Sequence, residues 1–256
     1  MDLRILGTHN LESRETRMAS YVIDGVIALD AGSITRSLTF DEQLAVEAVI
    51  LSHRHFDHTR DLFPLGVYTG LAGSTTDIFA IEDTMDFVLG TLLDTRNCPD
   101  FGQWPSPDRP TFRYHTMDFY KEFNVLGYTA TAVPVPHSAP AAGVQVTDGR
   151  VKLFYTGDTG RGLSDAWKHV SPDVLLTEVT YGNENEEQAQ LMGHLTPRLL
   201  GECLHDFKAT LGYLPMVIAS HINPPWEEQV RQGLKELSRD IGIEITVAEH
   251  DRTMRL

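Results

Sequence analysis

The sequence predicts an α/β protein in which two β-sheets are enclosed between helices. Short apolar segments typical of strands outnumber the helical patterns, and they recur in both halves of the chain. No internal repeat, low-complexity tract or linker interrupts the chain, so residues 1–256 are expected to form one domain. With 41% hydrophobic residues, a chain of this length can bury a substantial core.

The first half of the chain is expected to consist mainly of strands. Apolar runs bounded by polar residues predict strands at 3–7, 19–32, 45–53 and 77–81. Asp24-Gly25 supplies a hairpin turn inside the second of these segments, and residues 82–93 have a helical pattern. Because prolines are frequent in residues 97–110, we expect residues 95–120 to form a lid that shapes the substrate pocket.

The second half repeats the pattern of a strand that ends in polar residues. Strands are expected at 128–138, 142–160, 172–182, 215–225 and 243–250. Thr196 and Pro197 predict the start of a helix, since they suit the N-cap and the first helical position. Residues 226–242 predict the last helix, with Val230 and Leu234 on its apolar face.

Composition limits the partners and the location of the protein. The net charge of −15 repels polyanions, so long nucleic acid is not an expected partner. The N-terminal segment is too short and too charged for a signal peptide, and no apolar run approaches the ~18 residues of a membrane span. We therefore expect a soluble, cytoplasmic protein with no membrane partner. A homodimer is compatible with the sequence.

The cysteines limit the kind of metal site. Cys98 and Cys203 lie far apart in the sequence and form no CxxC pattern, which argues against both a disulfide framework and a thiolate zinc site. Any transition metal must therefore be held by imidazole and carboxylate groups.

The segment SHRHFDHTRD, residues 52–61, has the composition of a metal site. His53, His55 and Asp57 share parity, so an extended segment points all three in the same direction, and His58 follows at once. Two imidazoles can reach one ion while the Asp57-His58 pair reaches a second, which predicts a two-metal centre. The alternative is a solvated histidine cluster at a helix start.

Three later residues have matching positions at strand ends. His137, Asp158 and His221 each follow an apolar strand and begin a turn. Each alone is more often a capping residue than a ligand, but together with the histidine-rich segment they predict a complete dinuclear site that a carboxylate can bridge. Two divalent ions are expected. Zinc is the first choice, and manganese or iron suits the same donors.

The order of these motifs, from the segment LDAG at 29–32 to His221, resembles that of the metallo-β-lactamase-fold hydrolases. The resemblance implies an αββα sandwich of four layers, with Asp158 bridging two metals and a metal-bridging hydroxide as the nucleophile. It implies that the ligands of the first metal are His53, His55 and His137. It implies that those of the second are Asp57, His58 and His221. For Asp30 it implies a hydrogen bond to a ligand histidine.

A stretch that contains Glu178 and the segment GHLTP around His194 is similar to the phosphodiesterase branch of this family, which includes ribonuclease Z and the class II cyclic-nucleotide phosphodiesterases. The resemblance implies catalytic roles for Asp57, Glu178 and His194, with His194 in contact with the substrate phosphate. A protonated His194 beside Glu178 would give its proton to the leaving oxygen, a contribution of ~10²–10⁴-fold. Alternatively, His194 only caps its helix.

A small phosphodiester, first of all a 3′,5′-cyclic nucleotide, is the expected substrate. Ribonuclease Z has a long arm for transfer RNA between the positions of His137 and Asp158, whereas residues 138–157 suffice only for a hairpin here. The alternatives are transfer-RNA 3′-end cleavage, hydrolysis of a ribosyl cyclic phosphate, and thioester or lactone hydrolysis. A metal-binding regulatory domain without activity is the non-enzymatic alternative.

Aromatic residues of the expected lid are candidates for contact with the substrate. Phe101 and Trp104 could stack on a base, although ordinary packing is the alternative for each. Phe56 stands where leucine is usual in the histidine-rich motif of the cyclic-nucleotide class.

Overall fold

The computed structural model describes residues 1–256, and its strands form two mixed seven-stranded sheets. The first sheet has the order β16-β1-β2-β3-β4-β5-β8, made of Arg252–Arg255 (β16), Asp2–Gly7 (β1), Ser20–Ile23 (β2), Ile27–Leu29 (β3), Ala48–Ile50 (β4), Thr76–Ala80 (β5) and Phe112–Thr116 (β8). The second has the order β15-β14-β13-β12-β11-β10-β9, made of Ile245–Val247 (β15), Met216–Ser220 (β14), Val174–Glu178 (β13), Lys152–Tyr155 (β12), Ala141–Thr147 (β11), Tyr128–Val135 (β10) and Glu122–Val125 (β9). A two-stranded ribbon is formed by Pro105–Ser106 (β6) and Arg109–Pro110 (β7).

The two sheets have the same pattern of pairing. From β16 to β3 and from β9 to β12 the neighbouring strands are antiparallel. From β3 to β8 and from β12 to β15 they are parallel. The carboxyl ends of parallel neighbours meet at one edge of a sheet, which is where ligands bind in many α/β proteins.

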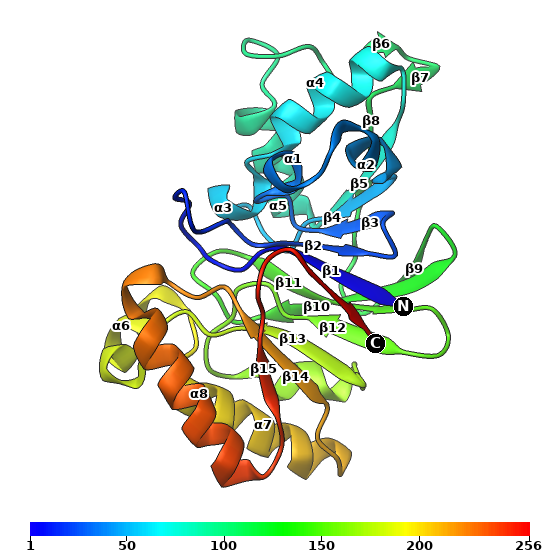
Figure 1. Ribbon diagram of the computed structural model, residues 1–256. Helices are drawn as coiled ribbons and strands as arrows, with labels where there is room; N and C mark the ends of the chain where they lie inside the picture. Colours follow the sequence, from blue (N-terminus) through cyan, green and yellow to red (C-terminus); the bar gives the residue numbers. More distant parts are fainter.

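Helices cover the outer face of each sheet, and the two sheets face each other (Figure 1). The first half contains Ile34–Ser37 (α1), Phe40–Ala45 (α2), Phe56–Thr59 (α3), Leu62–Ala72 (α4), Glu82–Phe87 (α5) and a π-helical turn, Val88–Leu92. The second half contains Glu186–Met192 (α6), Pro197–Leu211 (α7), Glu227–Ile241 (α8) and short 3₁₀ segments at Leu163–Lys168, Asn183–Asn185 and Pro224–Trp226. No helix combines the length and the apolar character needed to cross a bilayer.

Three buried apolar layers hold the sheets and helices together. One lies between the sheets, one between the second sheet and α7 and α8, and one between the first sheet and the helices of the first half. Successive residues of a strand alternate between layers: Leu175 faces the helices and Leu176 faces the other sheet. Strands buried on both faces explain the continuous apolar runs in the sequence. The predicted αββα sandwich is therefore confirmed.

The segment expected as a lid is partly built into the first sheet. β8 lies within residues 95–120 and pairs with β5, and the ribbon β6-β7 precedes it. A Cβ atom on Gly70 of α4 would lie 1.7 Å from the Trp104 ring, so this ring packs directly on the helix. Alternation of apolar and polar residues in β8, rather than the prolines before it, decides the structure there. β9 and β16 were not predicted, and the helix expected at 82–93 divides into α5 and the π-helical turn.

Candidate metal centre

Polar side chains gather where strands of both sheets end. His53 lies three residues after the end of β4, and His137 lies just beyond β10. Asp158 follows β12 and His221 follows β14 directly. His221 has a φ of 55°, a left-handed conformation that a side chain other than glycine seldom adopts, at the turn that directs its ring. These segments bring all seven of the expected ligands into two adjoining groups.

The first group contains three imidazoles and one carboxylate. One donor atom from each residue lies within 4.8 Å of the others, and the group consists of His53, His55, His137 and Asp158. Oδ2 of Asp158 lies 3.7 Å from Nε2 of His53 and 3.9 Å from Nε2 of His137. Three histidines and a carboxylate oxygen are suitable ligands for a zinc-like ion.

The second group shares the same carboxylate, and its members are Asp57, His58, Asp158 and His221. Here the other oxygen is used: Oδ1 of Asp158 lies 3.3 Å from Nε2 of both His58 and His221. Nε2 of His221 also lies 3.1 Å from Oδ2 of Asp57. Asp158 therefore turns one oxygen toward each group, which is the geometry required of a bridging ligand.

Two buried atoms in the centre lack a partner that a metal ion would supply. Nε2 of His53 and Oδ1 of Asp158 have no hydrogen-bond partner. Burying such atoms unpaired is costly, and native proteins seldom do so without an ion or a water. Burial also holds the pKa of His53 well below its usual value, so the imidazole is neutral, as a ligand must be. The donor set therefore fits two divalent cations, as is typical of dinuclear sites.

Hydrogen bonds to Nδ1 orient four of the ligand rings. Oδ2 of Asp30 accepts from His58 at 2.7 Å, which confirms the expected contact between Asp30 and a ligand histidine. Ser52 Oγ lies 3.0 Å from Nδ1 of His53, Gly193 O lies 2.8 Å from that of His137, and Thr180 Oγ1 lies 3.0 Å from that of His221. With Nδ1 engaged, Nε2 of each ring is left for the metal. Sequence reasoning missed these three partners. The sequence did offer a clue to two of them, because Ser52 is next to His53 and Thr180 is two residues after Glu178. It offered no clue to Gly193.

Glu178 and His194 form a close pair beside both groups. Oε1 of Glu178 lies 2.7 Å from Nδ1 of His194, and the His194 ring lies 5.1 Å from that of His137 and 5.8 Å from that of His221. Burial lowers the pKa of His194, but the carboxylate of Glu178 outweighs burial and raises this pKa to about 9. Thr196 caps α7 with its own side chain, so His194 does not serve as the cap.

The centre opens to solvent on the side of Asp57 and His194. Their side chains are 20% and 11% exposed, whereas those of His58 and His137 are fully buried. Phe56 lies between the ligands His55 and Asp57 in the chain and is 58% exposed. Asp57, His194 and Phe56 are therefore accessible to a substrate.

The aromatic residues expected in the substrate pocket lie elsewhere. Phe101 is 1% exposed and packs in the buried layer of the first sheet, against Phe112 and Gly66. Its ring has no free face on which a base could stack, so the expected stacking role does not fit its position. Trp104 packs against the same layer.

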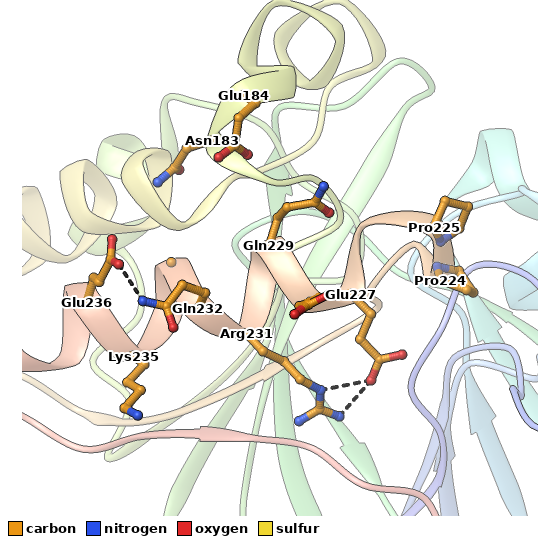
Figure 2. A pocket seen from close by; sticks show the side chains of 12 residues that line it. Asn183, Glu184, Pro224, Pro225, Glu227, Gln229, Arg231, Gln232, Lys235 and Glu236 are labelled. Carbon is orange, nitrogen blue, oxygen red and sulfur yellow. Dashed lines mark hydrogen bonds and ion pairs between the residues drawn. The ribbon is translucent and has the colours of Figure 1, made fainter.

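A separate open depression runs along α8 (Figure 2). It has a volume of about 1150 Å³, and no metal ligand lines it. Its charged side chains are those of Glu184, Glu227, Glu228, Glu236, Arg231 and Lys235. The excess of carboxylates makes this depression a poor site for an anionic substrate.

Comparison with known proteins gives one family match and distant relatives. The family model described as a beta-lactamase superfamily domain matches residues 19–222. Endoribonuclease YSH1 of Yarrowia lipolytica is 26% identical over 224 residues, covering 75% of this chain and 26% of that protein. The chain spans about a quarter of the length of the curated relatives it matches.

Three solved structures share the fold over nearly their whole length at low identity. Unliganded yeast PDE1 has a TM-score of 0.82 at 13% identity, with 100% of this chain and 99% of that chain covered. The short form of human tRNase Z has a TM-score of 0.71 at 18% identity, with the same coverage. Zn²⁺-bound PqqB from Methylobacterium extorquens has a TM-score of 0.73 at 17% identity, with both chains fully covered. These identities establish likeness of fold only.

Proposed function

The chain belongs to the beta-lactamase superfamily, and from this premise we propose that it hydrolyses a small phosphodiester, first of all a 3′,5′-cyclic nucleotide. The coarser assignment needs no proposal: the protein is a metal-dependent hydrolase of this superfamily with a buried site of histidines and aspartates. The finer one concerns the ester that this site cleaves.

The observation that carries the proposal is the Glu178-His194 pair beside a complete double set of ligands. Two bound cations would neutralise a phosphodiester and activate a water for attack on phosphorus. A thioester or lactone needs the cations as well, but it gives the His194 imidazole no evident task. A phosphodiester gives His194 a task, because an alkoxide leaves poorly unless it is protonated.

In the proposed reaction His194 acts as the general acid. Its Nδ1 is held by Glu178, so Nε2 is the nitrogen left for the substrate. As the water oxygen bonds to phosphorus and the P–O bond to the ribose breaks, Nε2–H gives its proton to the departing oxygen. The attacking water loses one proton to solvent as it bonds to phosphorus, and a proton taken from solvent then restores Nε2–H. The Asp57 side chain is 20% exposed, and its negative charge limits how close an anion can come without metal.

Phe56 is the residue that we propose for contact with the base, in place of Phe101 and Trp104. Phe56 lies between His55 and Asp57 in the chain and is 58% exposed, whereas Phe101 is buried. Stacking of a base on an aromatic ring contributes roughly 1–3 kcal/mol per base, and it tolerates any base because each has a flat face. Leucine, which is usual at this position in the cyclic-nucleotide class, lacks such a face.

Endonucleolytic cleavage of RNA is the second candidate, favoured by the match to an endoribonuclease over three quarters of the chain. Two features weigh against it. The segment between His137 and Asp158 contains only the hairpin β11-β12, with no room for an RNA-binding arm. The net charge of −15 also opposes contact with a long polyanion, whereas the charge of bound cations suffices for one phosphate.

A substrate panel on protein of known metal content tests the proposal. It consists of bis(nitrophenyl) phosphate, cyclic mononucleotides, a ribosyl cyclic phosphate, a precursor transfer RNA, a thioester and a lactone. We expect zinc-dependent turnover of the first two, with the cyclic nucleotides having the highest kcat/KM. Turnover confined to the thioester or lactone would remove the protein from the phosphodiesterases, and preference for the precursor would establish the second candidate.

A further inference from the structure

The hydroxyl of Thr180 lies where the second ligand group meets the Glu178-His194 pair. This residue is fully buried and lies two residues beyond the end of β13. Its oxygen lies 2.7 Å from Oε2 of Glu178, 3.0 Å from Nδ1 of His221, 3.0 Å from the backbone oxygen of His221 and 3.3 Å from Nδ1 of His194. No other side chain contacts both a ligand histidine and the carboxylate of Glu178 at these distances.

The single proton of this hydroxyl decides the direction of the hydrogen bonds. The carboxylate of Glu178 is the closest acceptor, and a hydrogen bond to a charged oxygen is the stronger one, so the hydroxyl donates there. Its lone pairs are then free to accept the Nδ1–H of His221. This fixes the tautomer of His221, because a proton on Nδ1 leaves Nε2 bare toward Asp57 and Asp158.

We propose that Thr180 is a positioning residue that couples the second metal ligand group to the proton-donating pair. A continuous chain of hydrogen bonds runs from Nδ1–H of His221 to the Thr180 hydroxyl, from that hydroxyl to Oε2 of Glu178, and from Nδ1–H of His194 to Oε1 of the same carboxylate. A cation held by His221 would therefore affect the orientation of His194 through the Thr180 hydroxyl and the Glu178 carboxylate. Only the catalytic meaning of His194 rests on the proposed function.

The other contacts of Glu178 explain why the Thr180 hydroxyl affects the orientation of the Glu178 carboxylate but is not needed for folding. Its carboxylate also accepts backbone N–H groups of Thr159, Thr180 and Leu195, at 3.1, 3.0 and 3.2 Å. Removal of the hydroxyl thus leaves the buried charge solvated by the backbone but lets the carboxylate move away from His221. The Nδ1–H of His221 then loses its only acceptor, and the ring is free to turn.

Thr180→Val removes the hydroxyl and keeps the shape, Thr180→Ser keeps the hydroxyl, and Thr177→Val is the matched control. Thr177 is a buried threonine of β13, three residues before Thr180, and its hydroxyl contacts none of the expected ligands. Two readouts need no substrate: zinc affinity in competition with a chelator, and the NMR signals of the ring N–H groups of His194 and His221, which are assigned with single His→Gln variants.

We expect Thr180→Val to weaken binding of one of the two zinc ions by about 10–100-fold and to shift or broaden both ring N–H signals. Thr180→Ser and Thr177→Val should match the parent protein in both readouts. Unchanged zinc affinity in Thr180→Val, or a changed His221 signal with an unchanged His194 signal, would overturn the coupling. Serine behaving like valine would overturn it too, since the effect would then come from packing. Because neither readout uses turnover, absence of phosphodiesterase activity would count against the proposed function alone.

Discussion

Replacement of Asp30 tests how the metal ligands are held. This residue is fully buried, and its carboxylate accepts four hydrogen bonds, from Ser52 N at 2.7 Å, Ser52 Oγ at 2.7 Å, His58 Nδ1 at 2.7 Å and Tyr155 OH at 2.6 Å. Three of these donors have no second acceptor: the Ser52 amide, the Nδ1–H of His58 and the Tyr155 hydroxyl. Asp30 also has a φ of 57°, a conformation that asparagine tolerates and alanine does not.

For Asp30→Ala we expect loss of the folded state. A buried donor left without an acceptor costs about 1–3 kcal/mol, so three of them cost roughly 3–9 kcal/mol, and the positive φ adds about 1–2 kcal/mol for alanine. This total approaches the whole stability of a typical protein, which is about 5–15 kcal/mol. The measurement is thermal and urea unfolding of the metal-free protein.

Asp30→Asn separates folding from metal binding. Its remaining oxygen can serve the Ser52 amide, and the hydroxyls of Ser52 and Tyr155 can turn to accept from the new NH₂ group. Nδ1 of His58 can accept a hydrogen bond from that NH₂ group only if the ring proton moves from Nδ1 to Nε2, the atom that faces Asp158. We expect a folded variant that loses about 1–3 kcal/mol, with Tm lower by about 2–4 °C per kcal/mol, and that holds zinc about 10–100-fold more weakly. Parent-like zinc affinity in a folded Asp30→Asn variant would refute the reasoning about the tautomer.

Three further predictions concern the centre and its opening. His194→Ala should keep both metals but lose about 10²–10⁴-fold in turnover of esters with alkoxide leaving groups, and much less with nitrophenolate; equal losses on both would contradict the role of proton donor. Phe56→Ala should raise KM for cyclic nucleotides by roughly 5–150-fold, as expected from the loss of 1–3 kcal/mol of stacking, and should leave KM unchanged for a phosphodiester with two methyl groups and no base. Trp104→Ala should lower Tm without altering base preference. Steady-state kinetics on purine and pyrimidine substrates show which of the two residues contacts the base. Removal of metal with a chelator should abolish activity and lower the free energy of unfolding. The loss is about 2.7 kcal/mol for each site at which the free zinc concentration was 100 times the Kd, and adding zinc should reverse it. A Tm that does not respond to chelator and zinc would argue against a metal centre.

The sequence by itself determined the fold class and the chemical nature of the centre. Successive side chains of a strand point to opposite faces, so an alternating apolar run indicates burial on one face and a continuous apolar run indicates burial on both. Neither inference requires knowing which element packs on the strand. His53, Asp158 and His221 each follow an apolar run and carry a group that binds metals. Position and donor chemistry together grouped them although they lie far apart in the chain and follow strands of two different sheets.

Only the tertiary structure decided how these groups are oriented. Spacing in the chain does not tell which oxygen of Asp158 faces which histidine, nor that Asp30 and Thr180 hold the Nδ1 atoms of His58 and His221. The prolines and aromatic residues of the expected lid suggested Phe101 for contact with a substrate, whereas its ring is buried against Gly66. These properties depend on contacts between residues tens to hundreds of positions apart. Hydrogen-bond direction and side-chain exposure exist only once both partners are in place, whereas strand period and ligand chemistry are local to each segment.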